Sequence, residues 1–134
     1  MARRRNQVVS ERLSLSYDHA ALTADTTTKL WKCPSGRSFK VTRVSYVNPT
    51  GLAADGTNYF NLKVLKGAST VMANWSTLTG QEGTLTADTF VSFTLSSTAA
   101  NLVLQAGDEL SFFADETNTA TLPAGRLVVE GDLY

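Results

Sequence analysis

Apolar and polar residues alternate with a period of two along most of this chain, and no segment sustains the 3.6-residue period of an amphipathic helix. In the clearest case, Leu13, Leu15 and Tyr17 alternate with Ser14 and Ser16 and predict a first strand. The other segments with strand character are residues 26–33, 39–47, 59–65, 70–78, 90–95, 102–104, 109–114 and 126–133. The pattern therefore predicts an all-β chain with minimal helix.

Two of these segments have patterns that go beyond simple alternation. Residues 39–47 start with Phe39 on one face and continue with Val44 and Tyr46 at the other parity, which predicts a bulge or a strong twist. Residues 59–65 are almost continuously apolar, so we expect both faces of that strand to be covered.

Turn-forming residues separate the strand segments. Gly, Pro, Asn, Asp and Ser gather where tight turns need them, at residues 34–36, 48–51, 55–58, 80–83, 106–108 and 123–125. Short strands at this spacing predict a single-domain antiparallel β-sandwich, and among sandwiches we prefer a jelly roll of about eight strands. We expect an extended basic N-terminal arm over residues 1–9 and the sandwich domain over residues 10–134.

Charge distinguishes the N-terminus from the rest of the chain. The sequence has 12 basic and 12 acidic residues, and three of the basic ones are the consecutive Arg3, Arg4 and Arg5. The remainder has nine basic residues (12 − 3) against 12 acidic ones. Such an arm could bind nucleic-acid phosphates, dock into an acidic groove of a protein, or serve as a solubilising end without a partner. Because the body has no second basic stripe, we favour the protein partner over nucleic acid.

The cysteine count and the apolar runs give expectations about the compartment. The single cysteine, Cys33, cannot form an internal disulfide, which fits a reducing compartment, and its place near Trp31 in a strand segment favours burial. No run approaches the roughly 20 apolar residues that a transmembrane helix needs. No apolar stretch follows the arginines as it does in a secretory signal. We therefore expect synthesis in a cytoplasm and no membrane partner.

Few residues in the chain could carry catalysis or bind a metal. His19 is the single histidine, and no G-x-S-x-G pattern accompanies it, so we expect it in a solvated loop and expect no enzyme activity. One Cys and one His cannot complete a tetrahedral zinc site, and we expect no cofactor. The oxygen-rich turns that contain Asp55 and Asp115 suit a calcium ion as well as plain turn formation, and this alternative stays open.

The aromatic residues raise the question of carbohydrate binding, because sugars stack on exposed rings. Trp31, Trp75, Tyr46 and Tyr59 all fall within strand segments. Core packing or subunit contact is therefore the favoured use of these side chains.

With these residues in place, the sequence resembles the small all-β head cement or decoration proteins of tailed double-stranded DNA bacteriophages. The resemblance rests on the basic arm, a Thr-rich jelly-roll-like body, and the order of the turns at residues 47–52, 106–110 and 121–126. It implies a structural virion protein that binds the outer surface of the capsid and stabilises contacts between major capsid proteins. It also implies a homodimer or homotrimer with no active site and no cofactor.

The resemblance assigns capsid binding to the arm, which would lie across neighbouring capsid subunits. The residues so assigned are Ala2, Arg3, Arg4, Arg5, Asn6, Gln7, Val8 and Val9. Two other functions stay open. One is a receptor- or carbohydrate-binding β-module of a phage tail or fibre, and the other is a jelly-roll shell protein whose basic arm contacts nucleic acid.

Overall fold

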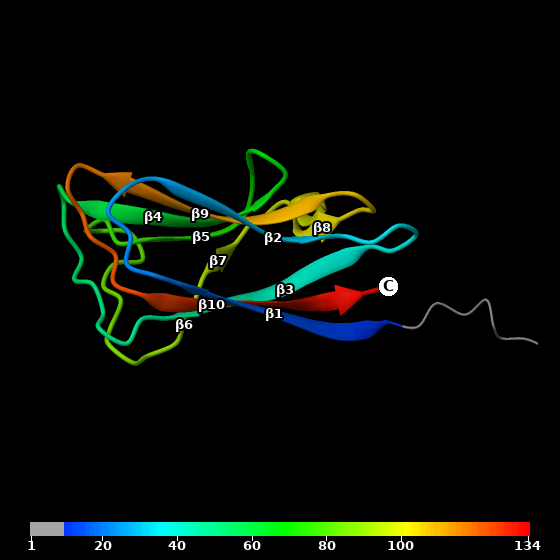
Figure 1. Cartoon of the computed structure of the whole chain (residues 1–134), viewed down its shortest axis with the longest axis horizontal. Helices are drawn as coiled ribbons and strands as arrows, with labels where there is room; N and C mark the ends of the chain where they lie inside the picture. Colours follow the sequence, from blue (N-terminus) through cyan, green and yellow to red (C-terminus); the bar gives the residue numbers. More distant parts are fainter. Residues whose placement is uncertain (1–9) are drawn as a thin grey trace, which may run out of the picture.

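The protein is a β-sandwich of two antiparallel sheets, seen in a computed structural model that describes residues 10–134 (Figure 1). The predicted all-β sandwich is confirmed. Among the described residues the elements are β1 (Glu11–His19), β2 (Thr26–Lys32), β3 (Phe39–Val47), β4 (Tyr59–Lys66), β5 (Thr70–Ser76), β6 (Val91–Ser92), β7 (Thr94–Leu95), the 3₁₀ helix η2 (Ala99–Leu102), β8 (Val103–Leu104), β9 (Glu109–Thr117) and β10 (Gly125–Leu133). No helix among residues 10–134 is long and apolar enough to cross a membrane.

The chain passes back and forth between the two sheets. One sheet has the order β1-β10-β3-β6, with β8 also paired to β3, and the other has the order β2-β9-β4-β5-β7. The first and last long strands, β1 and β10, are therefore neighbours over their whole length, from Glu11 opposite Leu133 to His19 opposite Gly125. We call the first sheet the β1 sheet and the second the β2 sheet.

The core lies between the two sheets and consists of the side chains that point inward from each strand. The largest side chains that are fully buried include Tyr46 and Phe39 of β3, Phe60 of β4 and Phe112 of β9. Trp31 of β2 packs against the core, in an edge-to-face contact with Phe39 at 5.2 Å between ring centroids. Because the alternation of each strand places its apolar residues on this face, burial in the core stabilises the pairing register as well as the packing.

The bulge that the sequence predicts in β3 is confirmed. Gly131 of β10 lies opposite Val41, whereas the preceding Glu130 lies opposite Arg43, so that Thr42 is the extra residue of β3. The bulge moves the buried apolar positions of β3 from odd numbers, Phe39 and Val41, to even numbers, Val44 and Tyr46, in keeping with the parity change in the sequence.

Two expectations from the sequence are wrong. Residues 90–95 form two short strands in different sheets, because the chain crosses the sandwich at Phe93, whose buried side chain enters the core. The strand β4 is fully covered on one face only. On its other face Tyr59, Asn61 and Lys63 are half-exposed, and Leu65 is buried.

Candidate functional site

A row of side chains crosses the outer face of the β1 sheet near the end where β1 finishes and β10 begins. Asp18 lies directly opposite Arg126, and Arg126 lies directly opposite Val47. Phe90 precedes β6, whose Val91 is paired with Tyr46 on β3. Since directly opposite residues of neighbouring strands point to the same face, the register alone brings Asp18, Arg126 and Val47 together.

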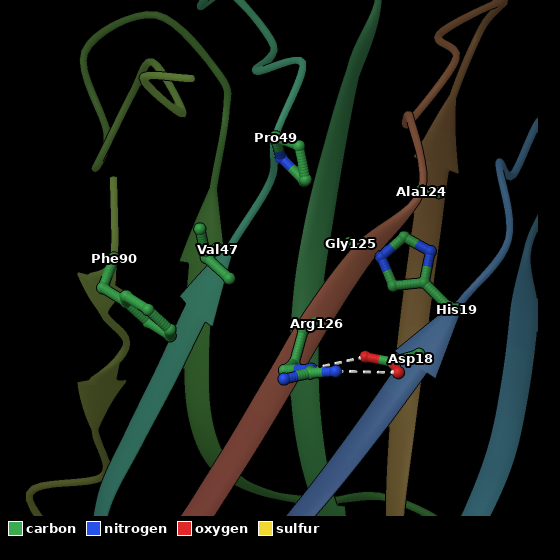
Figure 2. A pocket seen from close by; sticks show the side chains of 8 residues that line it. All are labelled: Asp18, His19, Val47, Pro49, Phe90, Ala124, Gly125 and Arg126. Atoms are coloured by element: carbon green, nitrogen blue, oxygen red, sulfur yellow. Dashed lines mark hydrogen bonds and ion pairs between the residues drawn. The ribbon is translucent and has the colours of Figure 1, made fainter. Parts of the chain in front are cut away.

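This row borders a shallow hollow of about 490 Å³, which we call the docking hollow (Figure 2). Its lining residues are Asp18, His19, Val47, Pro49, Phe90, Ala124, Gly125 and Arg126. Phe90 stands at one side of it with 58% of its surface exposed, and the ion pair of Asp18 and Arg126 stands at the other side. The docking hollow therefore offers an apolar ring and a polar pair to whatever contacts it.

The ion pair of the docking hollow has the two-pronged geometry of an arginine fork. Arg126 donates from Nε to Oδ1 of Asp18 at 2.6 Å and from Nη2 to Oδ2 at 3.1 Å. These hydrogen bonds lower the pKa of the Asp18 carboxyl below its ordinary value and raise that of the Arg126 guanidinium. Both side chains are exposed, so the pair fixes the orientation of two charged groups without contributing much to stability.

His19 forms the inner wall of the docking hollow and is held from both ring nitrogens. Nδ1 lies 2.7 Å from the carbonyl oxygen of Ala20, and Nε2 lies 2.6 Å from the hydroxyl of Tyr46. Because a carbonyl oxygen can only accept, Nδ1 carries the proton, and Nε2 accepts the hydrogen bond that Tyr46 donates. The sequence-based expectation of a solvated loop is wrong: His19 is the last residue of β1 and is buried, because its parity on β1 points into the sandwich.

The amide of Asn48 completes this buried network. Its Oδ1 accepts hydrogen bonds from the backbone N–H groups of Thr50 and Gly51, which fixes the orientation of the amide. Nδ2 then donates to the hydroxyl of Tyr46 at 3.2 Å and to the carbonyl of Pro123 at 2.7 Å. The side chain of Asn48 thus links the end of β3 to Pro123, which lies just before β10.

Burial sets the protonation of the two titratable groups in this network. It lowers the pKa of His19 below its ordinary value, against the opposing effects of the Ala20 carbonyl and the Asp18 carboxylate. It raises the pKa of Tyr46 to about 12. A neutral imidazole whose nitrogens are both occupied, next to a phenol that stays protonated, forms a structural hydrogen-bond chain. In this arrangement His19 has no free nitrogen to accept a proton from a nucleophile.

The two oxygen-rich turns lie together, yet hydrogen bonds within the protein account for them. Asp55 Oδ1 accepts from the backbone N–H groups of Thr57 and Asn58, and Asn58 Oδ1 accepts from Thr119. Asn118 donates to the carbonyl of Thr57. Within residues 10–134, no group of three or more His, Cys, Asp or Glu side chains is arranged to hold a metal ion.

The structure describes some of the other candidate residues and not the predicted arm. The predicted arm residues Ala2–Val9 lie outside the described residues. Trp31, Trp75 and Tyr46 pack in or against the core, as predicted, and Trp75 also donates to the carbonyl of Gly83 at 3.1 Å. Tyr59 is half-exposed on β4 and does not belong to the core cluster. Cys33 is buried, which confirms the expectation drawn from its place near Trp31.

Sequence reasoning missed Phe90 as a surface residue and the ion pair between Asp18 and Arg126. The sequence pattern places Phe90 at the start of a strand, whereas in the structure Phe90 precedes β6 and is exposed, before the chain crosses the sandwich at Phe93. The ion pair joins residues 108 positions apart, so only the pairing of β1 with β10 brings them together. Comparison of the chain with protein-family models, with curated proteins and with solved structures found no match.

Proposed function

We propose that this chain is a structural virion protein, a cement or decoration protein that binds the outside of a phage head and stabilises contacts between major capsid proteins. The observation that carries the proposal is the docking hollow, where the exposed Phe90 ring and the charged fork of Arg126 and Asp18 stand at opposite sides. Aromatic rings and arginine are the side chains that contribute most to protein–protein contacts.

The chemistry of the docking hollow supports a binding role in preference to a catalytic one. His19, the residue best suited to act as a base, has both nitrogens engaged by Tyr46 and Ala20. The charged groups at the rim neutralise each other and point to solvent. A protein surface that brings an apolar pocket and a hydrogen-bonding group could meet Phe90 and Arg126 at once.

The order of strands supports the jelly-roll part of the proposal. Eight of the strands form two four-stranded sets, β1-β10-β3-β6 and β2-β9-β4-β5, and most connections cross from one sheet to the other. Two Greek keys wound together give this alternation, and jelly rolls are used widely as virion modules. In the proposal the basic arm, Ala2–Val9, makes a second contact with the capsid, and many symmetric copies strengthen the binding of each.

The test is co-sedimentation of the purified chain with expanded, undecorated heads of the phage that encodes it. We expect Phe90→Ser to weaken binding by about tenfold or more, as for a central interface residue. Tyr134→Ser is the matched control, because Tyr134 is the other large hydrophobic residue exposed among the described positions and lies at the opposite end of β10. The control should bind as the wild type does.

Deletion of residues 1–9 tests the arm separately from the docking hollow. Loss of binding by the deletion with full binding by Phe90→Ser would assign the contact to the arm and overturn the role of the docking hollow. If the wild-type chain itself does not sediment with heads at low or moderate salt, the decoration function is overturned. Circular dichroism of each variant shows whether the fold is retained.

A further inference from the structure

The strand β1 is a long edge with no strand on its outer side in the described part of the chain. All nine of its residues pair with β10, and its other row of N–H and C=O groups is left without a strand partner. The strand contains no proline and no bulge, and its inward residues Leu13, Leu15 and Tyr17 are half-buried apolar side chains. A long, regular edge with one apolar face is a template for another strand.

The other edges of the sandwich have features that discourage such pairing. The strand β2 at the neighbouring edge has a bulge between Lys29 and Trp31 and carries two exposed lysines, Lys29 and Lys32. The strands β6, β7 and β8, at the far side, have two residues each. Bulges, short length and charged side chains, lysine above all, are the usual protections of an edge strand. The strand β1 has nine residues, no bulge and no lysine, and its charged residues are Glu11, Arg12 and Asp18.

We propose that β1 pairs antiparallel with β1 of a second copy of this chain, about a twofold axis at Leu15. The segment of β1 from Arg12 to Asp18, RLSLSYD, is complementary to itself in that register. Arg12 meets Asp18 of the other copy, Leu13 meets Tyr17, Ser14 meets Ser16, and Leu15 meets Leu15. The two partners of each pair lie on the same face of the sheet. They are both apolar, both serine, or of opposite charge, which makes the surface complementary to itself as an isologous interface requires.

The charges that flank β1 extend this complementarity across the sheet. Within one copy, Arg12 lies 3.5 Å from Asp132, which is opposite Lys40, and Asp18 is bound to Arg126. In the paired register the row runs Lys40, Asp132, Arg12, then Asp18 and Arg126 of the second copy. The signs alternate at every step, so each of the three inner charges lies between two of the opposite sign.

Neighbouring registers lose this match. Shifting the axis by one residue to Ser14 places Arg12 opposite Ser16, and shifting it to Ser16 places Arg12 opposite Ala20. In both cases Arg12 and Asp18 of different copies no longer meet. The charge pattern therefore selects the axis at Leu15.

The pairing also covers apolar surface at the open side of the sandwich. A small hollow of about 140 Å³ lies between β1 and β2, lined by Leu15, Ser16, Tyr17, Lys29 and Leu30. The inward Leu13, Leu15 and Tyr17 of the second copy would continue the same apolar layer beside it. Ser10 of one copy then lies opposite Ala20 of the other, so that each chain enters β1 next to the docking hollow of its partner.

The inference deepens the proposed function, because it gives the decoration protein its partner copy and the surface that joins them. It is tested without heads, so its outcome is separate from that of capsid binding. Light scattering coupled to size-exclusion chromatography should give the wild type twice the chain mass of 14.4 kDa. The variants R12D and D18R should each be monomers, because like charges then face each other across the axis.

Mixing the two variants gives the decisive result. R12D presents two aspartates and D18R two arginines along the edge, so a one-to-one mixture should form a heterodimer although neither variant dimerises alone. Arg43→Asp is the matched control, since Arg43 is exposed on the same sheet face but lies on β3, and it should stay dimeric. A monomeric or trimeric wild type, dimeric single variants, or a mixture that stays monomeric would each overturn the pairing.

Discussion

The hydroxyl of Tyr46 lies 2.6 Å from Nε2 of His19, and this bond joins the end of β1 to the centre of the β1 sheet. The two rings also stack, at 5.7 Å between centroids and an interplanar angle of 7°. The contact bridges the two strands that flank β10 on either side. This hydrogen bond therefore holds the inner wall of the docking hollow in place. Its removal should lower the free energy of unfolding of the domain.

Replacement of Tyr46 by Phe keeps the ring and removes the bond. We expect the free energy of unfolding to fall by about 1–3 kcal/mol, because Nε2 of His19 is left buried without a donor. Urea unfolding followed by tryptophan fluorescence measures the change. Tyr59→Phe is the control, since Tyr59 is a half-exposed tyrosine on β4, and it should leave the unfolding midpoint unchanged.

The depressed pKa of His19 makes stability depend on pH in one direction. As the pH falls below the ordinary histidine value of about 6.5, the unfolded chain takes up a proton that the folded chain resists. The free energy of unfolding should therefore decrease as the pH falls through and below about 6.5, and this contribution should level off about one pH unit above that value. Unfolding curves between pH 5.5 and pH 7.5, a window chosen above the titration of most carboxylates (roughly pH 4), check this. His19→Gln should flatten the dependence, and an equal slope in both proteins would contradict it.

Gly131 occupies a place on β10 where no side chain fits. A Cβ there would collide with the carbonyl oxygen of Lys40 and come within 2.7 Å of Cζ of Phe39. Because both neighbours belong to the packed sheet and core, we expect Gly131→Ala to destabilise the protein by about 1–3 kcal/mol. Gly56→Ala is the control, since a Cβ at Gly56 meets nothing within 4 Å. If the two variants had the same denaturant midpoint, β10 would be able to shift and make room for the added Cβ.

The thiol of Cys33 should be unreactive in the folded protein. It is buried with Sγ 3.4 Å from the carbonyl oxygen of Arg37, and burial raises its pKa above the ordinary value. Since the thiolate is the reactive form, a thiol reagent should modify Cys33 slowly in buffer and rapidly in urea. A Cys33→Ser/Ser35→Cys variant, which moves the thiol to an exposed neighbour, should react rapidly in both conditions. Fast reaction of wild-type Cys33 in buffer would show that the turn opens.

The sequence by itself determined the class of the fold and most of its strands. Alternation such as Leu13, Leu15 and Tyr17 placed β1 correctly, because a half-buried strand needs one apolar residue in every two. The parity change between Phe39 and Val44 predicted a bulge or a strong twist in this strand, and the pairing register places the bulge at Thr42. These features are local, since they depend only on which face of one strand is buried.

The tertiary structure alone decided which strands are neighbours, and with them the candidate sites. The pairing of β1 with β10 placed Arg126 on Asp18, and the crossing at Phe93 separated β6 from β7 and left Phe90 at the surface. The pairing with β10 also extended β1 to His19, which has the same inward parity as Leu13, Leu15 and Tyr17. Among residues 10–134 it left β1 with a strand partner on one side only. No local pattern encodes such contacts, because strand order depends on how several apolar faces are buried against one another at the same time.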